Sequence, residues 1–192
     1  MASPIPREQS GVGLSHKPRV LENGKVEVVE LFSYGCPYSM QAHPVIADWA
    51  ARKSGSVQLR RVPVGFGRVV WANLARLHYG LLGTGDLLRL ESVIFQDIHR
   101  RRVNLYVAEA IHTWVAQHGV DIEAYSRIAK SISVATVMGR NEGFVKQYGV
   151  TEVPTLVVGG AHLLQSRVRL SADGLIAEAD RLVSMALFPT KD

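Results

Sequence analysis

The sequence contains a single cysteine, Cys36, among its 192 residues. This excludes an intramolecular disulfide, and with it the disulfide framework typical of small secreted proteins. No second cysteine is available to share a metal ion, and the seven histidines show no paired ligand spacing, so we expect no metal site. A lone thiol is then either inert or central to the function.

Long apolar runs are also missing. No stretch approaches the roughly 18 apolar residues that a membrane-spanning helix needs, and residues 1–7 hold no apolar signal core, so we expect the mature segment of a protein. The chain is 47% hydrophobic and 20% charged, a composition that can bury a core. Residues 1–24 are expected to form an extended N-terminal arm, since they include Pro4, Pro6 and Pro18.

Nucleic-acid motifs and aromatic-interleaved basic stripes are absent, although the formal net charge is +5. The most basic run, Arg100–Arg102, follows an amphipathic segment. Cations at the end of a helix interact favourably with the negative end of its dipole. We therefore expect no nucleic-acid partner. The positive charge favours acidic partners or membrane surfaces.

The first part of the chain alternates between strand and helix patterns. Residues 26–32 are β-branched and apolar except at two glutamates, which predicts a largely buried strand. Residues 38–53 predict a helix that ends at Ser54-Gly55, and residues 56–64 return to strand character. Together they predict a parallel, right-handed strand–helix–strand unit.

The rest of the chain predicts a helical region followed by a hairpin. Helical periodicity runs between about residues 67 and 148, with room for four or five helices. Strand character resumes around Gly159-Gly160, a strong hairpin signal, and a last amphipathic helix is expected at residues 172–187. We predict one domain from residues 25–66 and 149–188, interrupted by an inserted helical domain.

The strongest local signal is the motif Cys36-Pro37-Tyr38-Ser39, where a buried strand ends and a helix begins. Unpaired backbone N–H groups and the positive end of the helix dipole favour a thiolate there. Proline lacks a backbone N–H group, but the first turn of a helix does not need this donor for its own hydrogen bonds. Cys36 is therefore predicted to be a nucleophile exposed at the strand edge; the alternative is a small buried hydrophobic residue.

A second signal is Val153-Pro154, immediately before a strand. Proline cannot donate to a sheet, so it belongs at the start or edge of a strand. A cis peptide bond here would turn the Val153 backbone outward, where its N–H and C=O groups could pair with an extended peptide.

These features resemble the DsbA family of bacterial thiol–disulfide oxidoreductases over about residues 25–188. The resemblance implies an α/β protein with a thioredoxin fold and an inserted all-helical domain. It also implies that Cys36 is the redox-active nucleophile, that Pro37 and Tyr38 tune it, and that Val153 with Pro154 forms a cis-proline pair facing it.

Glu30 lies six residues before Cys36 inside the apolar strand. It matches the family's buried acidic residue, which is thought to assist proton movement near the active site. Burial would disfavour the charged form of its carboxyl group. The alternative is an edge-facing, solvated glutamate.

Ser39 departs from the family pattern, which has a second cysteine at this position. A hydroxyl cannot form a disulfide, but it could hydrogen-bond to a Cys36 thiolate. A mixed disulfide on Cys36 would need another thiol, such as glutathione, to resolve it; no other cofactor is expected. Two explanations stay open, a natural monothiol enzyme and a dithiol oxidase whose second cysteine has been replaced by serine.

The resemblance further implies proteins or peptides with cysteines as substrates, a membrane redox partner that recycles Cys36, and the periplasm as the compartment, with the signal peptide already absent. Two other functions are kept as alternatives. One is glutathione chemistry of the kappa-class transferase type, in which Ser39 or Cys36 would activate bound glutathione. The other is a non-catalytic thioredoxin-fold chaperone that holds peptides around Pro154.

Overall fold

The computed structural model describes residues 19–165 and 171–188. Most of the predicted N-terminal arm, residues 1–18, lies outside them. The described end of that arm is tied back to the first strand, because Val20 forms a β-bridge with Val26.

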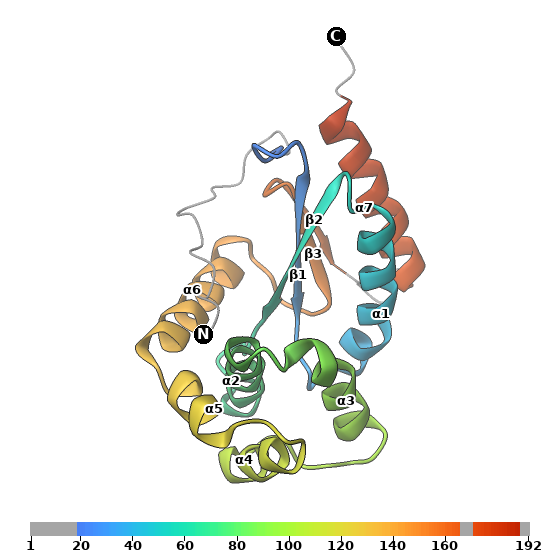
Figure 1. Cartoon of the computed structure of the whole chain (residues 1–192). Coiled ribbons are helices and arrows are strands. Elements are labelled where there is room, and N and C mark those ends of the chain that lie inside the picture. The colour runs from blue at the N-terminus through green and yellow to red at the C-terminus, as the bar shows by residue number, and fades with distance from the viewer. Residues whose placement is uncertain (1–18, 166–170, 189–192) are drawn as a thin grey trace. The chain divides into compact units, whose positions relative to one another are not determined.

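The described residues group into two compact units (Figure 1). The helical unit contains residues 33–37 and 63–145, and the sheet unit contains the remaining described residues. The domain boundaries predicted at residues 67 and 148 stay a prediction. One grouping was not foreseen from the sequence: the short segment with Cys36 belongs with the helices.

The sheet unit is built on four strands in the order β2-β1-β3-β4. β1 pairs antiparallel with β3, and β3 pairs antiparallel with β4. The bounds of the strands are β1 Val26–Phe32, β2 Val57–Pro63, β3 Thr155–Val158 and β4 His162–Gln165.

The contacts between β1 and β2 run in the same direction along both strands. Asn23, which lies just before β1, hydrogen-bonds to Gln58 of β2. Farther along both strands, Arg60 donates a hydrogen bond to Glu27 and Arg61 donates one to Glu30. In these pairs the residue numbers increase in the same direction on the two strands, as they do in parallel strands. This agrees with the predicted parallel strand–helix–strand unit.

The predicted hairpin joins β3 to β4 with three residues between the paired Val158 and His162. The Ala161 N–H donates to the Val158 carbonyl oxygen and closes a β-turn whose central residues are Gly159 and Gly160. Their φ angles are +60° and +69°. A β-turn with positive φ at both central positions matches the right-handed twist of the flanking strands, and glycine adopts that conformation without steric cost.

Two helices cover one face of the sheet: α1, Pro37–Arg52, and α7, Ala172–Leu187 (Figure 1). Ile46 from α1 and Leu175 from α7 are fully buried against β1 and β3. The two helices are also joined at Asp180, whose carboxylate accepts hydrogen bonds from Lys53, at 2.8 Å, and from Trp49 Nε1, at 3.2 Å. The hydrogen bond from Lys53 lowers the pKa of Asp180, and the bond from Trp49 adds to this effect.

The helical unit contributes five helices, within the predicted range. α2 contacts both α3 and α5, and α4 contacts α5. None of the helices in residues 19–165 and 171–188 is both long and apolar enough to cross a membrane. The bounds are α2 Val69–Thr84, α3 Leu87–His99, α4 Ala108–Gln117, α5 Ile122–Ala129 and α6 Ile132–Gln147.

α2 and α5 approach closely because α2 carries Gly80 and Gly83 at the contact. The ring of Tyr125 lies where a Cβ on Gly80 would be, and Ile128 lies 2.6 Å from the Cβ position of Gly83. Burial of Tyr125 between these helices raises the pKa of its hydroxyl group. Its phenol therefore stays neutral in the folded protein.

Candidate active site

Cys36 occupies a tight turn between a strand and a helix. β1 ends at Phe32 and α1 begins at Pro37. The N–H of Cys36 donates to the carbonyl oxygen of Ser33, at 3.0 Å, and the N–H of Gly35 donates to Ser33 Oγ, at 3.2 Å. The first turn of α1 contains no acidic residue, and the start of a helix presents unpaired backbone N–H groups.

The prediction that the Cys36 side chain is exposed was wrong, because the residue is only 6% exposed. The turn closed by the hydrogen bond between Cys36 and Ser33 buries Cys36, whereas the next two residues, Pro37 and Tyr38, lie at the surface. Tyr38 is 67% exposed. Cys36 thus lies directly beside an exposed segment of chain.

Within the helical unit, the turn is anchored by aromatic side chains. Tyr34 is fully buried, its hydroxyl lies 2.9 Å from His78 Nδ1, and its ring packs on Phe95 with centroids 4.8 Å apart. A Cβ on Gly35 would lie 2.7 Å from Trp71 Nε1, so only glycine fits there. The turn is therefore held by contacts at Tyr34 and at Gly35.

His78 was not predicted as a residue of the site, because the histidines were considered only as metal ligands. It is only 3% exposed. Its position on α2 offered a usable signal, since it follows Leu77 and lies one helical turn after Leu74, both buried. A histidine on an apolar face needs a polar partner, and here the partner comes from the Cys36 turn.

Glu30 is fully buried in β1 of the sheet unit. Arg61 Nε donates to Glu30 Oε2 at 3.1 Å, and His43 Nδ1 lies 3.4 Å from Oε1. The sequence singled out the carboxyl group but neither of these basic partners. The pairing offsets part of the cost of burying a carboxylate.

Replacing Glu30 by glutamine should destabilise the protein by about 2 kcal/mol, because the Arg61 guanidinium would face a neutral amide in a largely buried setting. The change can be measured by urea unfolding. Glu27→Gln is the matched control, since the pair of Glu27 and Arg60 is partly exposed on both sides and should contribute only about 0.5 kcal/mol. Equal losses in the two variants would contradict the special role of burial at Glu30.

The Val153–Pro154 peptide bond is cis. Val153 is 8% exposed, and the Thr155 hydroxyl fixes the loop by donating to the carbonyl of Glu152 at 2.7 Å. Thr155 pairs with Leu31, so the loop precedes β3 at the edge where β1 ends. Cys36 follows the last residue of β1, Phe32, by four positions in the sequence.

The predicted site residues are divided between the two units. Cys36 and Pro37 belong to the helical unit, whereas Ser39, Glu30 and the Val153-Pro154 pair belong to the sheet unit. Ser39 is fully buried in the first turn of α1. Within residues 19–165 and 171–188, no three histidine, cysteine, aspartate or glutamate side chains gather as metal ligands.

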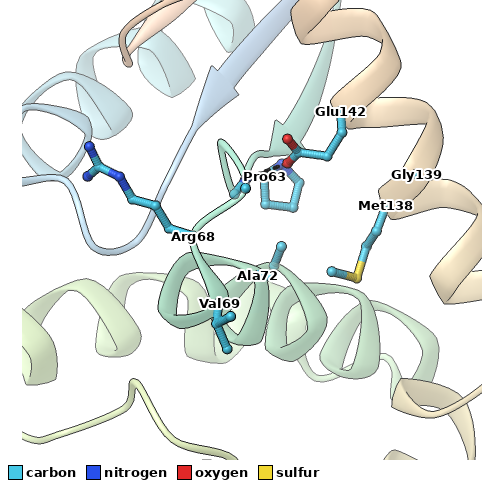
Figure 2. A pocket seen from close by; sticks show the side chains of 10 residues that line it. Pro63, Arg68, Val69, Ala72, Met138, Gly139 and Glu142 are labelled. Atoms are coloured by element: carbon cyan, nitrogen blue, oxygen red, sulfur yellow. Dashed lines mark hydrogen bonds between the residues drawn. The ribbon is translucent and has the colours of Figure 1, made fainter.

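The helical unit also contains an apolar hollow of about 240 Å³. Its lining includes Val69 and Ala72 from α2 and Met138 and Glu142 from α6, with Pro63 beside Glu142 (Figure 2). Glu142 Oε1 accepts a hydrogen bond from the backbone N–H of Gly65 at 2.8 Å, so this carboxylate is used to hold the loop before α2. The lining includes none of the predicted site residues.

Comparison with known proteins gives a consistent result. The family described as "DSBA-like thioredoxin domain" matches residues 27–175. The thiol:disulfide interchange protein DsbA of Azotobacter vinelandii is 32% identical over 88% of this chain and 78% of its own length, and that of Burkholderia cepacia is 30% identical over 95% and 85%. The crystal structure of Pseudomonas aeruginosa DsbA superposes with a TM-score of 0.79 at 29% identity, covering 89% of this chain and 88% of that one.

These similarities confirm the predicted fold class, a thioredoxin fold with a helical insertion. They cover both the strand regions and the helices between them. The chain belongs to the DsbA-like thioredoxin-domain family and is a thiol–disulfide oxidoreductase.

Proposed function

We propose that Cys36 is the nucleophile of this oxidoreductase. Its thiolate attacks one sulfur of a substrate disulfide, a new bond forms between the two sulfurs, and the other substrate sulfur leaves as a thiolate. The observation that carries this proposal is the position of the only cysteine, directly before the first residue of α1. Backbone N–H groups at a helix start favour a bound or local anion.

Ser39 limits what this chemistry can achieve. Because the hydroxyl cannot displace a sulfur, the mixed disulfide waits for an external thiol, for which we propose glutathione or a cysteine of a partner protein. That thiolate attacks the mixed disulfide and one of its two sulfurs leaves. The chain then acts as a monothiol enzyme, whichever of the two origins of Ser39 holds.

The other predicted residues receive supporting roles in this proposal. Pro37 and Tyr38 form the exposed surface next to Cys36, and Tyr38 offers an exposed aromatic ring for contact with the substrate. Val153 and Pro154 present backbone groups to an extended substrate. Glu30 relays protons within the sheet unit.

Substrates in this proposal are proteins or peptides that contain cysteines. We further propose that the chain works in the periplasm and that a membrane redox partner recycles Cys36. The transferase and chaperone alternatives have no specific observation in their favour, since the named relatives are interchange proteins.

A trapping experiment tests this function. The protein is mixed with a peptide whose cysteine is joined to an aryl thiol, the better leaving group. We expect one peptide adduct per chain by mass spectrometry, because the sequence has one cysteine. The adduct should persist until glutathione is added.

Cys36→Ala should form no adduct. The proposal fails if the folded protein stays unmodified while the urea-denatured chain reacts, because the turn would then protect the thiol instead of activating it.

A further inference from the structure

The turn that carries Cys36 makes one more contact, to the end of α3. Nε2 of His99 lies 2.7 Å from the carbonyl oxygen of Tyr34, two residues before Cys36. A carbonyl oxygen only accepts hydrogen bonds, so Nε2 must carry a proton and donate it. The neutral Nε2–H tautomer and the imidazolium both carry this proton, so the bond can form in either charge state of His99.

The imidazole ring is itself held in place. Its ring stacks on Phe95, one helical turn earlier in α3, with centroids 6.4 Å apart and an interplanar angle of 23°. Phe95 also packs on the buried ring of Tyr34. The side chain that donates and the residue that accepts therefore share one packing partner, which fixes the geometry of the bond.

We propose that His99 is a positioning residue for the reaction at Cys36. By donating to the Tyr34 carbonyl, it fixes the backbone of the turn that Cys36 N and Ser33 O close, and so holds the sulfur in the orientation for attack on a disulfide. His99 acts through Tyr34 and has no part in the bond exchange itself. This inference rests on the proposed role of Cys36 as nucleophile.

The test compares His99→Leu with His99→Gln. Leucine removes the donor, whereas the glutamine amide keeps an N–H at a similar distance from the backbone. The reaction followed is attack of the Cys36 thiolate on an aromatic disulfide reagent: one reagent sulfur joins Cys36 and the other leaves as a coloured aryl thiolate. We expect His99→Leu to react about fivefold more slowly than wild type, in line with the loss of one hydrogen bond, and His99→Gln to recover most of the wild-type rate.

His118→Leu is the matched control. His118 also contacts a carbonyl oxygen, that of Trp114 at 2.8 Å, and its ring packs on Trp114 with centroids 4.0 Å apart. It belongs to the same unit but touches no residue of the Cys36 turn through these contacts. His118→Leu should lower the melting temperature as much as His99→Leu does, while the reaction rate stays at the wild-type value.

Three outcomes overturn the inference: a wild-type or faster rate in His99→Leu, an equal slowing in His118→Leu, or no recovery in His99→Gln. Failure of the proposed function has a different signature. In that case the wild-type protein itself leaves the reagent unreacted, and the role of His99 falls with it.

Discussion

Ser39→Cys should allow the protein to release a trapped peptide without help from an external thiol. Residues 36 and 39 are one helical turn apart at the start of α1, a Cα separation of about 5 Å, within the range of natural disulfides. The new thiolate attacks the Cys36 sulfur of the mixed disulfide, forms an intramolecular disulfide with it and expels the peptide sulfur as a thiolate. Because both groups are on one chain, the effective concentration of the attacking thiol is in the millimolar range. At about 10 µM external thiol, release of the trapped peptide should therefore be about 100-fold faster.

The measurement is the rate at which peptide leaves the adduct after rapid removal of excess reagent. Ser39→Ala is the control and should keep the adduct as long as the parent does, because neither side chain can displace a sulfur. Cys36→Ala combined with Ser39→Cys should be inactive. A stable adduct in Ser39→Cys would mean that residue 39 cannot reach the mixed disulfide.

Gly80→Ala should destabilise the folded protein by about 2 kcal/mol. The added methyl group would overlap the Tyr125 ring, whose Cδ2 lies 2.8 Å from the Cβ position, and α2 and α5 would have to separate. Alanine is otherwise preferred over glycine in a helix by up to about 1 kcal/mol, so the cost is a net value. Urea unfolding measures it as a lower midpoint with an unchanged slope.

Gly139→Ala separates the steric effect from helix propensity. Gly139 is exposed in α6, and nothing lies within 4 Å of its Cβ position. The same substitution there should stabilise the protein by about 0.5–1 kcal/mol. If Gly80→Ala were also stabilising, the contact between α2 and α5 would be looser than the structure indicates.

Local signals predicted most of the fold. The last helix begins and ends where the apolar periodicity does, at residues 172 and 187, and Ser171 caps it by accepting from Gly174 N. The Gly159-Gly160 turn was predicted because positive φ at two adjacent residues restricts the choice of residue. Features of this kind depend only on neighbours in the chain.

The surroundings of the candidate site were harder to predict, because they join residues far apart in sequence. Tyr34 meets His78 at a separation of 44 residues and His99 at 65. The partner of Glu30, Arg61, depends on the register between β1 and β2, which the residues of either strand alone do not fix. The position of Cys36 between a strand and a helix was predicted correctly, but the burial of its side chain was not, because exposure depends on how the turn folds.

The compact helical unit is discontinuous in sequence, since it takes in the five residues from Ser33 to Pro37. Exchanging residues 63–145 for the equivalent stretch of a relative would therefore replace the side chains that contact the Cys36 turn along with the helices. Such a transplant would change the redox behaviour of a chain whose sheet and reactive motif were left untouched. The insertion is thus a means by which evolution or a protein engineer could retune the enzyme without altering its signature motif.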